Sequence, residues 1–387
     1  MRKICAFTGT RAEYGIMSRL LRMIKDDPDL KLQIVATNMH LSPEFGLTYK
    51  EIEGDGFVID KKVEMLLSSD TSNGTLKSMG LATIGFADAL SELSPDLALI
   101  FGDRYEMMAA ATACLINKIP VAHVGGGEIT EGAYDDAIRH CITKMSHLHF
   151  TETEEYWKRV IQLGESPERV FCVGAPGVNN IRSEKILSLP ELEQSIGFNL
   201  GSKYLLVTFH PVTLEADDAG AQCDNLLNAL KEVSEEYKLL FTLPNSDTNG
   251  RIIADKVRSF VLNHPDSSIS VVSLGKKRYF SALKHATAVV GNSSSGLIEA
   301  PSFNIPTLNI GIRQKGRTRG ASVYDVPATF EDIKKGLNII LSEPFMEQAK
   351  NAINPYEKDN TIDAIFQTIK RYPLDGIINK QFYDLPK

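Results

Sequence analysis

The sequence predicts an α/β protein made of two Rossmann-like domains that face each other across a cleft. Three observations predict this fold class. Short apolar runs alternate with amphipathic segments over most of the 387 residues, a pattern typical of parallel sheets covered by helices. Several apolar runs end directly at glycine and polar residues, as strands that lead into tight turns do. A charged stretch at 180–202, which contains Pro190, separates one alternating series from a second.

The length is compatible with two or three domains. We expect residues 1–176 to form an N-terminal domain and residues 177–354 to form a C-terminal one. A helix at about 361–371, within the terminal segment 355–387, is expected to pack back on the first domain. The 43% apolar and 24% charged residues are ordinary for a soluble globular protein with sizeable cores.

In the first half, a strand at 3–7 leads through a tight loop into an amphipathic helix at 12–25. Its apolar residues Ile16, Leu20 and Ile24 recur on one helical face. The further strands expected in this half lie at 32–37, within 52–59, and at 97–101, 121–124, 149–151 and 170–173. The further helices lie at 69–91, from 107 to 115, from 135 onwards and at 156–164.

The second half shows the same alternation without any repeat of sequence. Its expected strands lie at 204–209, 238–243, 269–274, 287–290 and 307–310. Its expected helices lie at 223–237, 251–263 and 279–285, and a further one opens within 297–303. This shared architecture is the reason for predicting two similar domains.

Composition excludes several classes of protein. The net charge of −7 argues against a nucleic-acid-binding surface. No apolar run approaches the length of a membrane span, and the basic start leads into a short strand rather than a signal peptide. The five cysteines are odd in number and form no CxxC or other metal-like spacing, as expected for reduced thiols in a cytoplasm. We therefore expect a cytoplasmic protein without nucleic-acid, membrane or metal partners.

Two neighbouring strands of the first half are followed closely by carboxylates. Asp103 follows the strand at 97–101, Glu128 follows the strand at 121–124, and Asp135 lies at the head of the next helix. Because ligands of open parallel sheets bind at the carboxyl ends of the strands, these residues are expected to gather where proton transfer can be arranged. Turns and helix N-caps also favour such residues, so the pattern alone leaves a structural interpretation open.

A candidate anion site follows the first strand. In Thr8-Gly9-Thr10-Arg11, a glycine precedes a helix start, so free backbone N–H groups and the helix dipole favour phosphate. The guanidinium of Arg11 also suits phosphate oxygens. The motif is short, and neither a GxGxxG nor a Walker sequence accompanies it.

A second candidate lies in the other half, in the small-residue loop Gly291-Asn292-Ser293-Ser294-Ser295-Gly296. Its hydroxyl and N–H groups can hold a diphosphate. Glu299, one turn into the following helix, can accept hydrogen bonds from ribose hydroxyls. The structural alternatives are a flexible loop with a serine N-cap and complementation of the helix dipole by Glu299.

Two further residues favour a diphosphate in the second half. His210 lies at the carboxyl end of a strand, directly before a proline. Arg313 shares a loop with two further arginines and a lysine, which suits a diphosphate. A structural histidine and a solvated basic loop remain the alternatives. Together these features indicate a nucleotide diphosphate bound mainly by the second domain.

In this order, the motifs resemble the hydrolysing UDP-N-acetylglucosamine 2-epimerases, and in particular the bacterial branch that starts sialic acid synthesis. The segments that carry the resemblance are Thr8–Gly15, Gly102–Glu106, Gly126–Glu128, Ile138–His140 with Ile142–Lys144, Phe209–Pro211, Gly291–Glu299 and Arg313–Arg317. The resemblance runs from the first strand to about Pro327. It implies a glycosyltransferase-B-type fold, a homodimer or dimer of dimers, and no nicotinamide or metal requirement.

The resemblance implies that UDP-N-acetylglucosamine and water give N-acetylmannosamine and UDP. The family is understood to eliminate UDP to a 2-acetamidoglucal, which is then hydrated. Asp103 and Asp135 match catalytic carboxylates of the family, and Glu128 matches the glutamate of a Gly-Gly-Glu motif. Some relatives carry a catalytic glutamate where this chain has Gly125, so Glu128 is expected to take over part of that role. His210 is expected to act with Arg313 on the departing diphosphate.

The resemblance also carries over the substrate contacts, with UDP as the bound part. These residues are Arg11, Arg104, Asn245, Ser293, Ser294, Ser295, Glu299 and Arg313.

Three alternatives remain. The same reaction on UDP-N,N′-diacetylbacillosamine, in the route to legionaminic acid, uses nearly the same motifs, and one substituent contributes little to pocket discrimination; UDP-N-acetylglucosamine is the preferred substrate at this stage. A nucleotide-sugar glycosyltransferase can share the fold, although the carboxylates and the lack of an acceptor-binding insertion argue against it. A non-catalytic sensor would bind a UDP-sugar without turning it over.

Overall fold

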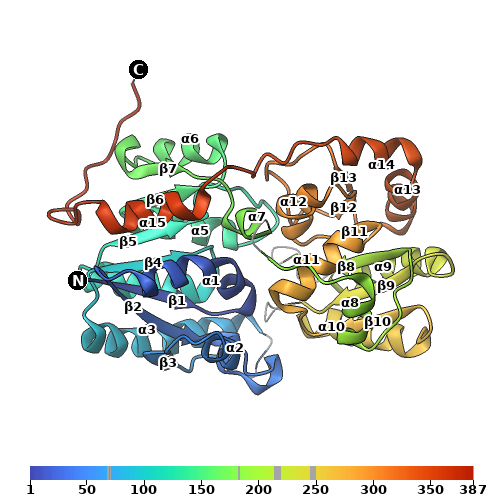
Figure 1. The fold of residues 1–387 in the computed structure, drawn as a ribbon, viewed down its shortest axis with the longest axis horizontal. Coiled ribbons are helices and arrows are strands. Elements are labelled where there is room, and N and C mark those ends of the chain that lie inside the picture. The colour runs from blue at the N-terminus through green and yellow to red at the C-terminus, as the bar shows by residue number, and fades with distance from the viewer. Residues whose placement is uncertain (68, 70, 182–183, 213–218, 245–249, 387) are drawn as a thin grey trace. The chain divides into compact units, whose positions relative to one another are not determined.

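A computed structural model of the chain describes residues 1–387 except 68, 70, 182–183, 213–218, 245–249 and 387. The chain divides into two compact units, each with its own parallel sheet (Figure 1), so the predicted two-domain α/β class is confirmed. Unit 1 comprises Met1–Glu128, Asp135–Asn180 and Tyr356–Lys387, and unit 2 comprises Ile129–Tyr134 and Ile181–Pro355. The changes of unit after Asn180 and after Pro355 lie within a few residues of the expected limits at 176 and 354. The short segment Ile129–Tyr134, which belongs to unit 2, was not anticipated.

Unit 1 is built on a seven-stranded sheet of order β3-β2-β1-β4-β5-β6-β7, in which every neighbouring pair is parallel. The strands are β1 (Arg2–Thr8), β2 (Leu30–Thr37), β3 (Lys61–Val63), β4 (Leu97–Phe101), β5 (Val121–Val124), β6 (Leu148–Thr151) and β7 (Val170–Cys172). The strand order reverses between β1 and β4. In open α/β sheets, ligands bind beyond the carboxyl ends of the strands at such a reversal.

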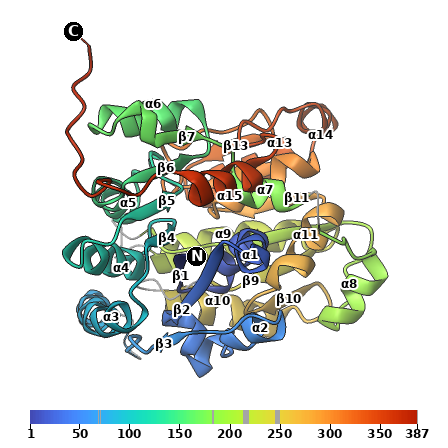
Figure 2. The same cartoon turned by 60° about the vertical axis from the view of Figure 1, so that its left-hand side comes forward.

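Helices cover both faces of this sheet. They are α1 (Arg11–Asp26), α2 (Tyr49–Gly54), α3 (Ser72–Leu93), α4 (Tyr105–Ile116), α5 (Asp135–Met145), α6 (Glu154–Gln162), α7 (Pro176–Ile181) and α15 (Thr361–Arg371). Side chains of β1 alternate between the faces: Ile4 and Ala6 join the core under α1, whereas Cys5 and Phe7 join the core under α3 and α4. Helix α15 packs against α1 (Figure 2) and buries its apolar residues in the first of these cores.

One predicted strand of unit 1 is wrong. The segment 52–59 forms no strand, because Ile52 lies in helix α2 and β3 begins only at Lys61. Ile52 and Phe57 are both buried in the core beside α1. Their apolar character therefore serves a helix and the turn after it, not a sheet.

Unit 2 is built on a six-stranded parallel sheet of order β10-β9-β8-β11-β12-β13. Its strands are β8 (Tyr204–Thr208), β9 (Lys238–Thr242), β10 (Ser268–Val271), β11 (Ala288–Gly291), β12 (Thr307–Ile310) and β13 (Val323–Val326). Its helices are α8 (Leu189–Ile196), α9 (Ala219–Val233), α10 (Gly250–Asn263), α11 (Gly275–His285), α12 (Ser295–Ile298), α13 (Phe330–Ile340) and α14 (Glu343–Lys350). The sequence did not predict β13, α13 or α14.

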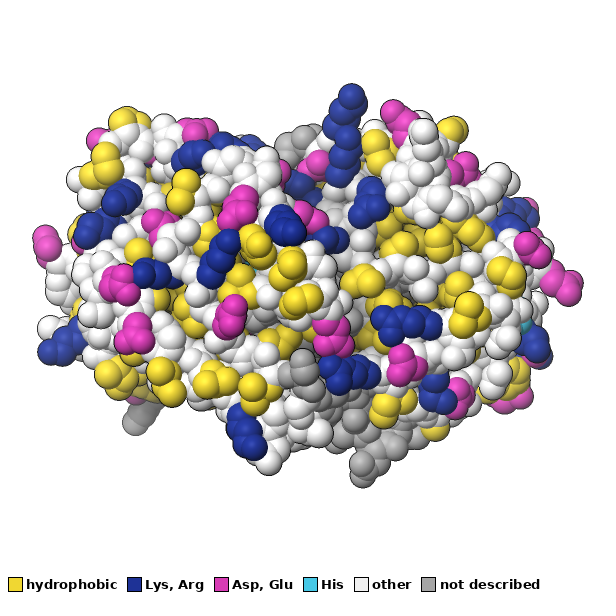
Figure 3. Space-filling view, turned by 90° about the horizontal axis from the view of Figure 1, so that it is seen from below, with side chains coloured by type: hydrophobic (Ala, Val, Ile, Leu, Met, Phe, Trp, Pro, Cys, Tyr) yellow, Lys and Arg dark blue, Asp and Glu magenta, His cyan; other side chains and the backbone are white. Residues whose placement is uncertain are grey.

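In the view of Figure 3, positive and negative side chains are interspersed with apolar ones and form no broad field of one sign. Across the described ranges, no helix has both the length and the apolar character needed to cross a membrane.

Candidate functional site

Three loops at the carboxyl ends of β1, β4 and β5 carry the polar residues of unit 1 that the sequence singled out. Glycine allows the turns after β4 and β5. Gly102, Gly125 and Gly127 have left-handed backbones with φ of +76°, +92° and +86°, which glycine adopts without strain. At Gly127 a Cβ atom would also lie 2.4 Å from the carbonyl oxygen of Tyr156. The glycines thus let the chain turn at the ends of β4 and β5, where Asp103 and Glu128 follow.

Arg139 joins these loops. This residue of α5 has a side chain that is only 1% exposed, and its guanidinium forms an ion pair with the carboxylate of Asp103. Its Nη1 also donates to the backbone oxygen of Glu128 at 3.0 Å and to Oδ1 of Asp136 at 3.3 Å. Burying a guanidinium is costly unless it has such partners. One rigid fork therefore holds the loop after β4, the loop after β5 and the first turn of α5 together.

The three predicted carboxylates differ in their surroundings. The side chain of Asp103 remains 22% exposed to solvent, although that of its partner Arg139 is buried. Glu128 is buried at 4% exposure. Asp135 is half-buried in the first turn of α5, where the helix dipole favours a negative charge. Asp103 and the backbone oxygen of Glu128 thus meet at the guanidinium of Arg139, which lies one helical turn from Asp135.

The loop after β1 is not the open anion site that the sequence predicted. The N–H groups of Gly9 and Thr10 donate to Oε2 of Glu13 at 2.9 and 3.1 Å, and the N–H of Glu13 donates to the Thr10 hydroxyl at 3.3 Å. This is a capping box, in which the chain supplies its own carboxylate to the helix start. The N–H groups of Gly9 and Thr10 are therefore already satisfied. The side chain of Arg11, in turn, pairs with Glu51 of α2 at 2.5 Å.

A second acidic residue lies against the same loop. Glu106 of α4 is fully buried, and its Oε1 accepts a hydrogen bond from Nε of Arg104 at 3.0 Å. A Cβ on Gly9 would lie 2.4 Å from that oxygen, so only glycine fits there. Burial, followed by the nearby charge of Glu106, raises the pKa of Glu13 to about 8, although Arg104 partly opposes the shift. Arg104, predicted as a substrate contact, thus has its Nε committed to Glu106.

In unit 2, Asn292 organises the corresponding loops. It is buried directly after β11; its Oδ1 accepts from the backbone N–H of His210 at 2.7 Å and its Nδ2 donates to the backbone oxygen of His210 at 2.8 Å. Its own backbone oxygen accepts from Nη1 of Arg313 at 3.1 Å and from Nε2 of Gln314 at 2.9 Å. One residue therefore fixes the loops after β8 and β12, which carry His210 and Arg313.

The serine loop continues from Asn292 into α12. Gly291 has φ of +135°, and a Cβ there would lie 1.9 Å from the backbone oxygen of Thr208. The Ser293 hydroxyl accepts from the N–H of Ser295 at 3.4 Å, and the hydroxyl of Tyr279 donates to Oγ of Ser295 at 2.6 Å. The remaining predicted contacts are Ser294, which precedes α12, Glu299, which follows it and is 8% exposed, and Asn245, which lies outside the described residues.

The fold places the chain in the class of two-domain α/β proteins with a glycosyltransferase-B-like architecture. The family model described as UDP-N-acetylglucosamine 2-epimerase matches residues 22–370. The chain therefore belongs to this family, whose relatives include hydrolysing UDP-sugar 2-epimerases.

Three curated relatives align over nearly the whole chain. The chain is 42% identical to the GDP/UDP-N,N'-diacetylbacillosamine 2-epimerase (hydrolyzing) of Campylobacter jejuni, over 99% of both proteins. It is 40% identical to the polysialic acid biosynthesis protein P7 of Escherichia coli, over 100% of this chain and 98% of that protein. It is 36% identical to the UDP-N,N'-diacetylbacillosamine 2-epimerase (hydrolyzing) of Legionella pneumophila, over 98% and 99%.

Solved structures share the fold. A co-structure of S. aureus MnaA with UDP aligns over 100% of both chains with a TM-score of 0.79 and 18% identity. UDP-GlcNAc 2-epimerase from Neisseria meningitidis, bound to UDP-GlcNAc, aligns over 95% of this chain and 99% of that one with a TM-score of 0.78 and 18% identity. At this identity the match establishes the architecture.

Sequence reasoning assigned no role to the two residues that tie the loops together, Arg139 and Asn292. Both lie inside segments that carried the family resemblance, Ile138–His140 and Gly291–Glu299. Their residue types could have indicated this role, because an arginine guanidinium with several N–H donors, and an asparagine amide that both donates and accepts, can each bond to several loops. Among the residues that the structure describes, no group of three or more His, Cys, Asp or Glu side chains is arranged to hold a metal ion.

Proposed function

We propose that the protein is a hydrolysing 2-epimerase that converts UDP-N,N′-diacetylbacillosamine and water to UDP and the free diacetamido sugar inverted at C2. The proposal rests on the Asp103 carboxylate paired with Arg139 and on the two relatives named for this reaction, at 42% and 36% identity over the full length. It replaces the initial preference for UDP-N-acetylglucosamine. The motifs did not separate the two substrates, because these sugars differ at C4 and C6, whereas the motif residues are assigned to UDP and to the reaction at C1 and C2.

The reaction requires three proton transfers. In the elimination, the C2–H bond and the bond from C1 to the UDP oxygen break while a C1–C2 double bond forms. In the hydration, water adds to C1 and a proton reaches the opposite face of C2. Asp103, Asp135 and Glu128 divide the roles of base at C2, acid at C2 and base for water, which suits carboxylates in differing environments.

Arg139 supports these roles without moving a proton. It fixes Asp103, while the 22% exposure of that side chain leaves the carboxylate open to a substrate. A group held in one orientation before the substrate arrives lowers the cost of reaching the transition state.

The residues of unit 2 bind the nucleotide. His210 and Arg313, whose loops Asn292 fixes, stabilise the charge that develops on the departing diphosphate. We propose further UDP contacts from unit 2, namely Ser293, Ser294, Ser295, Glu299 and Asn245. Arg104 and Arg11 are proposed as substrate contacts from unit 1.

The expected cytoplasmic location and the expected homodimer or dimer of dimers belong to the same proposal.

The second candidate substrate is UDP-N-acetylglucosamine. The polysialic acid biosynthesis protein, at 40% identity, favours it, because the family branch that the motifs resemble starts sialic acid synthesis.

The experiment supplies the purified protein with each UDP-sugar and no acceptor, and follows UDP and free sugar by chromatography. We expect kcat/KM for the diacetylbacillosamine nucleotide to exceed that for UDP-N-acetylglucosamine by at least about tenfold, which is the lower end of the discrimination that one changed group in a binding pocket produces. Turnover of UDP-N-acetylglucosamine alone would establish the second candidate. Absence of free sugar from both would contradict hydrolysis and favour a transferase, and binding of both without any turnover would favour a sensor.

A further inference from the structure

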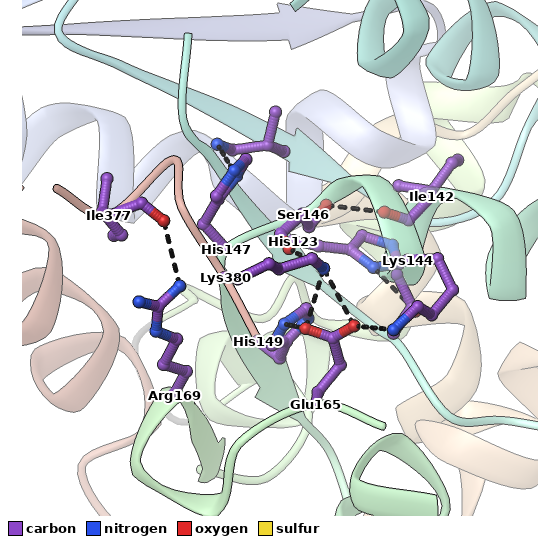
Figure 4. A network of polar contacts seen from close by, with 12 residues as sticks. His123, Ile142, Lys144, Ser146, His147, His149, Glu165, Arg169, Ile377 and Lys380 are labelled. Atoms are coloured by element: carbon purple, nitrogen blue, oxygen red, sulfur yellow. Dashed lines mark hydrogen bonds and ion pairs between the residues drawn. The ribbon is translucent and has the colours of Figure 1, made fainter. Parts of the chain in front are cut away.

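His123 lies directly beneath the loop that carries Asp103 and takes no part in the proposed proton transfers. It belongs to β5, and its side chain is completely buried. Its Nε2 lies 2.8 Å from the backbone oxygen of Gly102, and its Nδ1 lies 3.2 Å from the hydroxyl of Thr143 on α5. Figure 4 shows the ring among the other polar side chains of this part of unit 1.

The partners determine which ring nitrogen carries the proton. A carbonyl oxygen only accepts, so Nε2 of His123 carries the hydrogen and donates to Gly102. In a neutral imidazole Nδ1 is then the acceptor, and the Thr143 hydroxyl donates to it. Burial lowers the pKa of His123 to about 4, with His149 and Arg139 acting in the same direction and the Gly102 carbonyl and Asp103 opposing them. The ring is therefore neutral near pH 7 and its hydrogen-bond directions are fixed.

These bonds fix the peptide from which Asp103 departs. Gly102 has φ of +76°, its N–H donates to the backbone oxygen of Val124 at 2.9 Å, and its carbonyl accepts from His123. Both polar groups of Gly102 are thus tied to β5. The Asp103 carboxylate at the next position is tied separately to Arg139 of α5.

The same pair also supports the loop that leads to Glu128. A Cβ on Gly126 would lie 2.9 Å from the Thr143 hydroxyl and 3.3 Å from Nδ1 of His123, so the backbone there rests on the pair. His123 and Thr143 therefore contact the loop after β4, the loop after β5 and the helix that bears Asp135.

We propose that His123 is a positioning residue, which acts with Thr143 to hold the Gly102–Asp103 peptide in the position and orientation in which Asp103 contacts the substrate. The inference rests on the proposed role of Asp103 and adds the residue that holds it in place.

The test compares three substitutions in the full-length protein. His123→Phe fills the same space without a donor, and we expect kcat to fall about 100-fold, the cost of a misplaced catalytic group, while KM changes little. His123→Gln should restore most of kcat, because its amide nitrogen can donate to Gly102 and its oxygen can accept from Thr143. Thr143→Val, which removes only the outer bond, should lower kcat about tenfold and serves if His123→Phe does not fold.

His147→Phe is the matched control. This histidine is also buried, at 3% exposure, and accepts from the backbone N–H of Val121 at 3.2 Å, at the opposite end of β5. We expect its kcat to equal that of the wild type. A loss of kcat in His147→Phe equal to that in His123→Phe would overturn the proposal, since any buried histidine of the sheet would then have the same effect.

Amide hydrogen exchange supplies a readout that does not depend on turnover. We expect the Gly102 amide to exchange about tenfold faster in His123→Phe, and at the wild-type rate in His123→Gln and His147→Phe. Unchanged exchange at Gly102 in His123→Phe would overturn the proposal, whether or not kcat falls. If the wild-type protein turns over neither UDP-sugar, the proposed function fails, and the exchange rates still decide whether His123 holds this peptide.

Discussion

Two ion-pair groups on the sheet of unit 1 distribute their charges in opposite ways. At the carboxyl ends of β4 and β5, the cation Arg139 is sealed at 1% exposure and the anion Asp103 is 22% exposed. Beside β6, the anion Glu165 is sealed at 1% exposure and its cations Lys144 and Lys380 are 38% and 21% exposed. A carboxylate at the surface with a fixed cation behind it can meet a substrate. A carboxylate enclosed by cations can only hold parts of the chain together.

The second group joins three distant parts of the chain (Figure 4). Glu165 accepts from Nζ of Lys144 at 2.5 Å, from Nζ of Lys380 at 2.8 Å and from Nε2 of His149 at 3.0 Å. Burial alone would raise the pKa of Glu165, but the bonds from these three partners outweigh it and lower the pKa to about 2. Helix α5, strand β6 and the C-terminal segment are therefore held by one carboxylate that stays ionised near neutral pH.

The largest expected effect separates the two groups by activity. Asp103→Asn keeps the size of the side chain but removes the proton acceptor, so we expect kcat to fall by about 10³-fold or more. Asp96→Asn is the matched control, because its carboxylate accepts from the N–H of Lys3 at 2.8 Å at the amino-terminal end of β4. Full activity in Asp103→Asn would contradict the catalytic assignment of this carboxylate.

The second-largest expected effect distinguishes the two ion-pair groups by their contributions to stability. Glu165→Gln leaves two lysines without their shared counter-charge, and we expect the free energy of unfolding to fall by about 3 kcal/mol in urea titrations. At a temperature where the variant is folded, kcat should stay close to that of the wild type. Glu92→Gln, which breaks an exposed pair with Lys61, should cost less than about 1 kcal/mol. If Glu165→Gln lowered kcat as strongly as Asp103→Asn, the contrast between the two groups would be lost.

The smallest effect concerns Glu13, a carboxylate that is buried without a full complement of cations. Its pKa is raised to about 8, so the folded state holds its proton more tightly than the unfolded state does. Its contribution to stability is complete below the unfolded pKa of about 4.3 and is lost as the pH rises through about 8. We expect the free energy of unfolding to decrease between about pH 5 and about pH 8, and Glu13→Gln to reduce that slope.

Glu191 provides the control for Glu13, because it closes the capping box of α8 while lying exposed on the surface. Hydrogen bonds from Ser188 lower the pKa of Glu191. Glu191→Gln should therefore leave the slope between about pH 5 and about pH 8 unchanged. An equal change of slope in both variants would contradict the buried-acid explanation for Glu13.

The sequence was sufficient to predict most strands and the edge of the sheet at which the residues that follow them gather. Apolar runs predicted eleven of the thirteen strands that the structure describes, and missed β3 and β13. Parallel order brings Asp103 and Glu128 to one edge of the sheet. The sequence was insufficient for β13, where Val323 and Tyr324 are only partly buried at the edge of a sheet and give no clear apolar run. Ile52 was assigned to a strand because a short apolar pattern does not distinguish a strand from one turn of helix.

The site shows a similar limit. The motif Gly9-Thr10-Arg11 predicted free backbone N–H groups. In the structure, the N–H groups of Gly9 and Thr10 donate to the carboxylate of Glu13, because a carboxylate at the third helical position reaches back to the cap. Arg139 and His123 act through contacts with residues 36 and 21 positions away, respectively. Such contacts depend on the order of strands in the sheet, which periodicity does not give.

The most direct test of the central claim, that carboxylates of unit 1 remove and return the proton at C2, is turnover in D2O followed by proton NMR of the free sugar. We predict one deuterium at C2 in every product molecule from the first turnover onwards, because the proton that is returned comes from a side chain in exchange with solvent. Product that retains its original hydrogen at C2 would contradict the account.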